Sequence, residues 1–304
     1  MRVVFLGSDA WSVPSLEALS GVELVVTRAP KPAGRGSVLT PTSVAEAARR
    51  LRLPLAEVDT AKEGEGFDRI VAAEPEVLAV VAYGEILTMH VLRVATVGSV
   101  NLHFSLLPEF RGAAPVQRAL MSGHAGTGVS TILMDEGMDS GPILMQREED
   151  ILPNDDAGSL GGRLAGIGAD LLVETLDRLA ARELVPRPQD EREASFAPKI
   201  SAAERLIDWT EDAQSVVRRV RALAPSPGAS ARFRDDVLKI LRAEPAEVSG
   251  RPGEVLSAGK DGFVVGAGSG AVRPLEVAPA GRKHMSAEEF VRGFRPAQGE
   301  SLVG

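Results

Sequence analysis

The sequence contains no cysteine, which excludes disulfide bonds and thiolate metal sites. Histidine is scarce as well, and none of the four histidines is paired with another at the spacing of a zinc site. We therefore expect no metal. No apolar run reaches the length of a membrane span, and the run at residues 1–7 is too short for a signal peptide. These absences predict a cytoplasmic protein with no membrane partner.

The length and charge of the chain limit its class. A chain of 304 residues exceeds what one hydrophobic core usually organises, so we expect two domains. The hydrophobic content of 44% and charged content of 25% are ordinary for a globular protein. A net charge of −8 argues against unspecific binding of polyanions, although it leaves specific recognition of a nucleic acid undecided.

The N-terminal pattern predicts an α/β fold. Residues 2–6 form an apolar run that ends at Gly7 and is typical of a buried parallel strand. A short helix capped by Asp9 or Ser12 and a strand at 22–26 complete a β–α–β unit. The turn after Gly7 lacks the G-x-G-x-x-G spacing of a dinucleotide site. We expect a Rossmann-like, doubly wound, mostly parallel sheet that does not bind NAD.

The remainder of the chain divides at a polar, proline-containing segment. Before it we expect a very apolar strand at 77–84, a helix at 87–95 and a long amphipathic helix at 157–182. After it, short apolar runs separated by turn signals predict a small antiparallel barrel, and Ser286 with Glu289 predicts a capped final helix. The predicted division is a catalytic domain at 1–184, a linker at 185–202 and an OB-like β-barrel domain at 203–304.

The stretch from Asn101 to Pro115 has the most pronounced chemical pattern. Asn101 and His103 are two residues apart, so on a strand both side chains leave the same face. An amide that donates hydrogen bonds and an imidazole that transfers protons would then face one point. Pro108 and the Arg111-Gly112 pair end the strand and begin a loop. An isolated Asn-x-His is more often structural, so the functional interpretation depends on the longer pattern.

Residues 101–108 resemble the Asn-x-His-x-Ser-Leu-Leu-Pro signature of folate-dependent formyltransferases, and residues 134–141 are similar to the family loop that carries its catalytic aspartate. This resemblance implies that Asn101, His103 and Asp139 are catalytic, that 10-formyltetrahydrofolate is the co-substrate and that no metal is used. The end of the run at 77–84 resembles the segment beside the pterin pocket of the family. The residues implied in folate binding are Tyr83, Gly84, Ser105, Leu106, Leu107 and Pro108.

Two further segments resemble the branch of this family whose acceptor is initiator methionyl-tRNA. One is the continuation at 111–115, and the other is the Pro-Ala-Gly-Arg-Gly loop at 32–36. The resemblance implies that Gly34, Arg35, Gly36 and Lys199 contact the tRNA. We expect a monomer, although the sequence does not determine the oligomeric state. Taken alone, a loop rich in glycine and proline is usually a solvated connector.

Other functions use the same residues. Relatives with the same asparagine, histidine and aspartate formylate the amine of a sugar nucleotide or of glycinamide ribonucleotide, or hydrolyse formyltetrahydrofolate. A non-catalytic nucleic-acid-binding protein built from a Rossmann-like unit and an OB module is an alternative of another class. The added C-terminal domain favours a tRNA acceptor. The acidic net charge and the complete triplet favour an enzyme.

Overall fold

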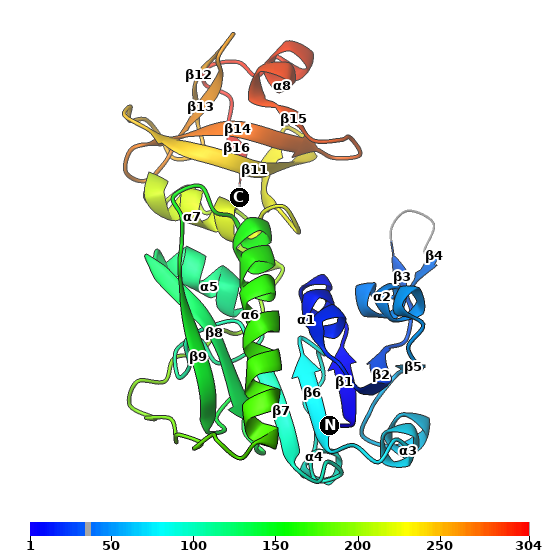
Figure 1. Ribbon diagram of the computed structural model, residues 1–304. Coiled ribbons are helices and arrows are strands. Elements are labelled where there is room, and N and C mark those ends of the chain that lie inside the picture. The colour runs from blue at the N-terminus through cyan, green and yellow to red at the C-terminus, as the bar shows by residue number, and fades with distance from the viewer. Residues whose placement is uncertain (34–37, 304) are drawn as a thin grey trace. The chain divides into compact units, whose positions relative to one another are not determined.

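The computed structural model describes residues 1–33 and 38–303 of the chain, whose contacts divide into two units (Figure 1). Unit 1 comprises Met1–Pro115, Gly126–Asp150 and Gly161–Pro198. Unit 2 comprises Val116–Ala125, Ile151–Leu160 and the residues from Lys199 onward. Each unit therefore draws on several stretches of sequence. The predicted division at 184 and 202 stays a prediction.

Unit 1 contains a seven-stranded sheet in the order β5-β2-β1-β6-β7-β8-β9. Its strands are β1 (Val3–Gly7), β2 (Val22–Arg28), β5 (Leu55–Val58), β6 (Val77–Val81), β7 (Gly98–His103), β8 (Gly126–Leu133) and β9 (Ile143–Asp150). The first five strands in this order are parallel, β8 is antiparallel to β7, and β9 is antiparallel to β8. The predicted Rossmann-like, mostly parallel sheet is confirmed.

The burial of the central strands explains this arrangement. Every residue of β1 and β6 is buried, because helices cover both faces of a parallel sheet and leave no side for polar residues. The helices of this part of the chain are η1 (Ala10–Ser12), α1 (Val13–Ala18), α2 (Ser43–Leu51), α3 (Gly64–Ala72), α4 (Met89–Leu92) and α6 (Ala157–Ala180). The helix expected at 87–95 is shorter than predicted, because only Met89–Leu92, which form α4, are helical.

The long helix α6 covers one face of the sheet beside β7 and β8 (Figure 1). Gly168 has no side chain because the Leu102 side chain of β7 occupies the space where a Cβ atom would stand. Thr175 of α6 and Thr131 of β8 share a hydrogen bond of 2.9 Å. Since successive residues of a strand face opposite ways, Asn101 and His103 point to the face of β7 that α6 does not cover.

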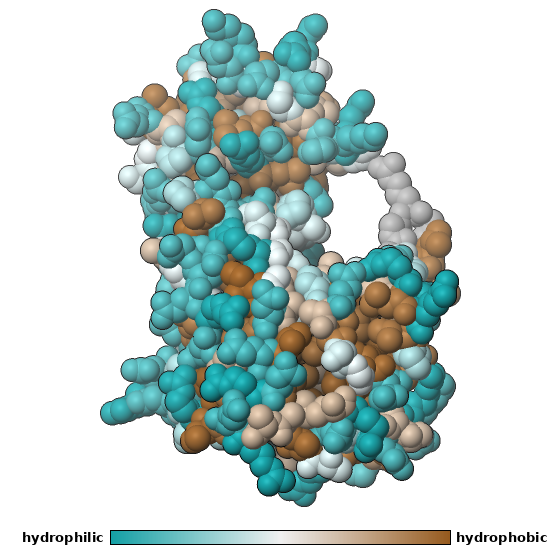
Figure 2. All heavy atoms as spheres, in the orientation of Figure 1, coloured by the Kyte–Doolittle hydropathy of each residue, from teal (hydrophilic) through white to brown (hydrophobic). Residues whose placement is uncertain are grey.

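A short hairpin flanks the residues expected to form an exposed loop. It consists of β3 (Lys31–Ala33) and β4 (Val38–Thr40), which pair in antiparallel register. Gly34, Arg35 and Gly36 lie outside the described residues, so their predicted role in tRNA binding remains a prediction. Val38 and Leu39 are 66% and 65% exposed, and other large apolar side chains are exposed as well, in keeping with the hydrophobic areas that interrupt the hydrophilic surface in Figure 2.

Unit 2 is built around an antiparallel sheet in the order β12-β13-β14-β11-β10-β16, with β15 paired to β14. The strands are β10 (Ala229–Phe233), β11 (Asp236–Ala246), β12 (Val255–Gly259), β13 (Gly262–Gly266), β14 (Ala271–Pro279), β15 (Met285–Ser286) and β16 (Leu302–Val303). The helices are α5 (Pro115–Ser122), η2 (Ala203–Arg205), α7 (Ala213–Leu223) and α8 (Ala287–Phe294). The sheet curls into a half-barrel, which confirms the predicted OB-like domain.

The core of unit 2 joins α7 and α8 to this sheet. Phe290 of α8 contacts Phe233 of β10 and Phe263 of β13, with ring centroids 5.4 Å apart in both pairs. The start of α8 is fixed by the predicted capping box: Ser286 accepts from the Glu289 amide, and the Glu289 carboxylate accepts from the Ser286 amide. The pattern in the sequence therefore located this helix correctly.

An ion pair within unit 2 predicts a pH-dependent contribution to stability. Arg118 of α5 donates to Glu204 of η2 at 2.5 Å, and the Ser201 amide donates to the same carboxylate at 2.9 Å. These contacts, the arginine first, lower the pKa of Glu204 from 4.5 to about 2. A carboxylate with a lowered folded pKa stabilises the protein above its unfolded pKa, and this stabilisation is lost as the pH falls through the folded value.

We expect Glu204→Gln to lower the free energy of unfolding at pH 7 by at most about 1 kcal/mol, because the pair is partly exposed. The deficit should shrink as the pH falls from 4.5 toward 2, because the wild-type carboxylate then loses its charge. Denaturant titrations over this pH range measure the difference in unfolding free energy between the variant and the wild type. Glu247→Gln, at an exposed position, is the control. A deficit that is constant with pH would contradict the account.

Candidate active site

The strand β7 presents Asn101 and His103 on one face, as their spacing predicts. β7 lies between β6, which is parallel to it, and β8, which is antiparallel. The side chains on its other face pack into the core, so the register of β7 is fixed by burial. Asn101 is 8% and His103 6% exposed, which means that both polar groups need partners within the protein.

Two loops that begin near opposite ends of β7 fold back over this face. The loop at 104–114 follows the carboxyl end of the strand. The loop at 134–142 joins β8 to β9 and begins beside the amino end of β7, because Leu133 pairs with Val100. Gly141 closes this second loop, since a Cβ atom there would lie 1.8 Å from the Leu133 carbonyl oxygen. Asp139 has a φ of 53°, a left-handed conformation that aspartate tolerates better than most residues.

The carboxylate of Asp139 joins the two loops to the strand. Its Oδ1 accepts from Asn101 Nδ2 at 3.2 Å, and its Oδ2 accepts from the Gly112 amide at 2.8 Å. The same Oδ2 lies 3.6 Å from Nδ1 of His103. The structure thus brings Asn101, His103 and Asp139 together. Gly112, which also contacts the carboxylate, was not among the predicted site residues.

The protonation of His103 follows from its other contact. Nε2 of His103 lies 2.9 Å from the carbonyl oxygen of Phe110, and a carbonyl oxygen only accepts. Nε2 therefore carries a proton, and in the neutral imidazole Nδ1 holds the lone pair that faces Asp139. The Phe110 carbonyl fixes the tautomer. A backbone atom has no signal in the sequence, so this contact could not be predicted.

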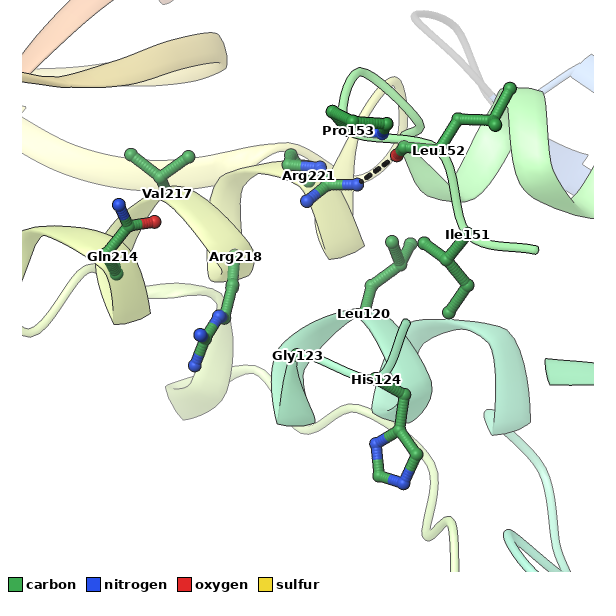
Figure 3. Close-up of a pocket in the computed structure, with 10 residues that line it drawn as sticks. All are labelled: Leu120, Gly123, His124, Ile151, Leu152, Pro153, Gln214, Val217, Arg218 and Arg221. Carbon is green, nitrogen blue, oxygen red and sulfur yellow. Dashed lines mark hydrogen bonds between the residues drawn. The ribbon is translucent and has the colours of Figure 1, made fainter. Parts of the chain in front are cut away.

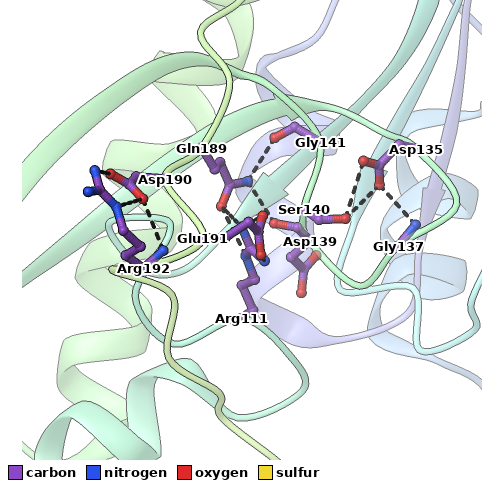
Figure 4. A network of polar contacts seen from close by, with 10 residues as sticks. All are labelled: Arg111, Asp135, Gly137, Asp139, Ser140, Gly141, Gln189, Asp190, Glu191 and Arg192. Carbon is purple, nitrogen blue, oxygen red and sulfur yellow. Dashed lines mark hydrogen bonds and ion pairs between the residues drawn. The ribbon is translucent and has the colours of Figure 1, made fainter.

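A second polar network attaches both loops to the segment that contains Gln189 and Glu191 (Figure 4). Arg111, which is 3% exposed, donates to the amide oxygen of Gln189 and forms two hydrogen bonds of 2.9 Å with the carboxylate of Glu191. This guanidinium lowers the pKa of the Glu191 carboxyl, which therefore stays ionised. Gln189 and Glu191 lie in the segment predicted to be a linker. Residues 185–198 of that segment belong by their contacts to unit 1, and residues 199–202 belong to unit 2.

The loop signature at 105–108 is anchored to β8. Ser130 donates from Oγ to the Ser105 carbonyl at 2.7 Å and accepts from the Leu107 amide at 3.0 Å. The Ser105 hydroxyl donates to the Glu109 carbonyl at 2.6 Å. Ser105 and Leu107 are buried, whereas Leu106 and Pro108 are partly exposed. The exposed members of this loop are the ones available to a ligand.

Tyr83 and Gly84, the two residues predicted to bind folate after β6, also differ in exposure. Tyr83 is part of the buried core of unit 1, and burial together with the charge of Glu85 raises the pKa of its hydroxyl. Gly84 is exposed and has a φ of 82°, a conformation that favours glycine. Gly84 therefore presents backbone to solvent next to the strand that carries Asn101 and His103.

The structure describes one of the residues predicted to contact tRNA, Lys199. Lys199 is exposed and belongs to unit 2. Within residues 1–33 and 38–303 no group of three histidine, aspartate or glutamate side chains is arranged to hold a metal ion. Among the helices of these same residues, none combines the length and apolar character needed to cross a membrane.

Unit 2 contains a separate pocket that none of the predicted site residues lines (Figure 3). Leu120, Ile151 and Val217 are apolar residues that line it, and Arg218 and Arg221 are its two lining arginines. Arg221 donates to the carbonyl oxygens of Leu152 and Asp155. These bonds hold the segment at 152–155 against α7.

An amide, an imidazole and a carboxylate in such mutual contact are groups that can stabilise a developing oxyanion and move a proton, as acyl transfer requires. Comparison with known proteins identifies the class. Residues 1–176 match the formyl transferase family and residues 199–295 match the C-terminal domain of formyl transferases. The chain belongs to the formyltransferase family.

Within this family the similar full-length relatives are methionyl-tRNA formyltransferases. A protein of that name from Thermus thermophilus is 44% identical, and the alignment covers 99% of each chain. Solved structures share the fold. HypX from Aquifex aeolicus in complex with tetrahydrofolic acid matches with a TM-score of 0.65, 19% identity and coverage of 100% of this chain and 50% of that chain. Methionyl-tRNA formyltransferase from Clostridium thermocellum matches with a TM-score of 0.57, 18% identity and coverage of 80% and 93%.

We expect Asp139→Asn to lower the turnover number of formyl transfer by about 10²–10⁴-fold, because an amide accepts a proton poorly. The near-identical shape of asparagine should keep the protein folded, which a thermal melt followed by circular dichroism checks. Glu136→Gln removes a charge from an exposed position of the same loop and should leave turnover unchanged. Full activity of the Asp139 variant would remove this residue from the chemistry.

Proposed function

We propose that this enzyme transfers the formyl group from N10 of 10-formyltetrahydrofolate to the α-amino group of initiator methionyl-tRNA. The observation that carries the proposal is the bonding of Asp139 to Asn101 and its approach to His103 on one face of β7. The full-length likeness to methionyl-tRNA formyltransferases supports the choice of acceptor.

The amide of Asn101 is suited to the charge that develops in this reaction. As the amine attacks the formyl carbon, negative charge grows on the formyl oxygen. One N–H of Asn101 donates to Asp139, which fixes the orientation of the amide and leaves its second N–H for this oxygen. The loss of one such donor typically lowers the rate by about 10²–10³-fold.

Asp139 and His103 are placed to handle the protons. A bond forms between the amine nitrogen and the formyl carbon, and the bond from that carbon to N10 breaks. The amine nitrogen must lose one proton, and N10 must gain one. Asp139 Oδ2 and His103 Nδ1 face the same space and can accept the proton, directly or through water, and return it to the leaving nitrogen. The reaction requires no covalent bond to the enzyme.

The folate is proposed to lie between the end of β6 and the loop that follows β7. Gly84, Leu106 and Pro108 offer exposed surface to it, while Tyr83, Ser105 and Leu107 support these positions from within the protein. Ligands of open parallel sheets bind outside the carboxyl ends of the strands, where these segments begin. The tetrahydrofolic acid bound by HypX, which shares the fold, supports a folate here.

The tRNA is proposed to contact the loop at 32–36 and the exposed Lys199. The exposed apolar side chains of β4 directly follow this loop, and such residues commonly mark a contact surface. We further propose that the enzyme acts as a monomer in the cytoplasm, where initiator tRNA is used in translation.

An assay with four acceptors tests the proposal. With 10-formyltetrahydrofolate as donor, we expect formylation of methionyl-initiator tRNA at a kcat/KM at least about 100-fold above that for an amino-sugar nucleotide or glycinamide ribonucleotide. Uncharged initiator tRNA lacks the amine and should give no product. Equal use of a small amine, or rapid release of formate without any acceptor, would favour one of the alternative functions.

A further inference from the structure

We propose that Gln189 is a positioning residue that holds the backbone of the Asp139 loop and so places the catalytic carboxylate. The inference rests on the proposed function, because it assigns Gln189 to the same reaction. Gln189 lies in the segment after α6 whose composition is that of a linker. Within unit 1 its side chain reaches the loop between β8 and β9 (Figure 4).

The amide group of Gln189 bonds to the loop on both sides of Ser140. Its Nε2 donates to the carbonyl oxygen of Asp139 at 2.8 Å and to that of Gly141 at 2.7 Å. The bonds of Asp135 with Ser140 and Gly137 are internal to the loop, so they shape it without attaching it to other segments. The two bonds from Gln189 instead tie the loop to a different part of the chain.

Arg111 determines which way the amide of Gln189 points. Nε and Nη2 of Arg111 donate to Oε1 of Gln189 at 3.0 and 2.8 Å, so the oxygen faces the guanidinium and the nitrogen must face the loop. Arg111 is itself held by the two bonds to Glu191. A buried arginine between a carboxylate and an amide oxygen has little freedom, which makes the amide a rigid contact.

The amide also connects the two loops of the site. Arg111 precedes Gly112, whose backbone amide donates to the Asp139 carboxylate, whereas Gln189 holds the Asp139 backbone. The catalytic residue is thus fixed at both its carboxylate and its carbonyl. Catalysis depends strongly on such placement, since a displacement of about 1 Å can lower a rate by about 100-fold.

Two substitutions separate a role in positioning from a role in satisfying Arg111. Gln189→Glu keeps an oxygen for Arg111 and strengthens that contact, but it places a second oxygen against two carbonyl oxygens and cannot donate to them. Gln189→Met removes both functions without adding charge, and it is measured in parallel in case the carboxylate prevents folding. Gln298→Glu adds the same charge at an exposed position of unit 2 and is the control.

In formyl transfer assays we expect both Gln189 variants to lower kcat by about 10- to 100-fold, with the KM for each substrate changed by less than about twofold. The hydrogen bonds of Gln189 described above all go to protein atoms, which is why kcat and not KM should change. The Gln298 variant should match the wild type. Wild-type kcat in Gln189→Glu would overturn the proposal.

Hydrogen exchange of single amides gives a readout that does not depend on activity. The Gly112 amide is protected by Asp139, and we expect its exchange to accelerate at least about tenfold in Gln189→Glu. The amides of Arg111 and Ala114 donate to Ser195 and Ala197 and should exchange as in the wild type. Unchanged protection of Gly112 would overturn the proposal. Lost protection in a protein that formylates no acceptor would support the positioning role and contradict the proposed function.

Discussion

The carboxylate of Asp139 is the point on which the site depends. It accepts hydrogen bonds from the side chain of Asn101 and from the backbone of Gly112, and it faces the imidazole of His103. One strand and two loops therefore meet at two oxygen atoms. A partly buried carboxylate needs hydrogen-bond donors in place of water, and the bonds that fix its place are such donors.

Other parts of unit 1 hold Asn101, His103 and Asp139 in these positions. β7 directs Asn101 and His103 to one face because Leu102 is packed against α6 on the other. The two loops arrive from opposite ends of that strand. The network around Arg111 attaches both of them to the segment that follows α6. Sheet, helix and polar network thus restrict the same few atoms, which is how an enzyme prepares a site before its substrate binds.

Much of this architecture could be predicted from the sequence because it depends on local patterns. The apolar runs marked β1 and β6, the i, i+2 spacing placed Asn101 and His103 on one face, and Ser286 with Glu289 marked the start of α8. The catalytic assignment itself came from the resemblance of two short segments to a family. The expected helix at 87–95 was too long, since only its middle turn is helical.

What could not be predicted depends on contacts between distant segments. The Phe110 carbonyl that sets the tautomer of His103 is a backbone atom, and its position follows from the path of a loop. Gln189 stands among prolines and charged residues, a composition that indicates a solvated connector, and its partners lie about fifty residues earlier in the chain. No periodicity or motif marks such a residue, because its role arises only when the chain is folded.

The most direct test of the central claim is a double-mutant cycle between His103 and Asp139, measured as the single-turnover rate of formyl transfer to methionyl-initiator tRNA. We expect His103→Gln and Asp139→Asn together to cost little more than the more damaging single change, with a coupling energy of about 1–3 kcal/mol. Strictly additive losses would contradict this claim, because the two residues would then act independently.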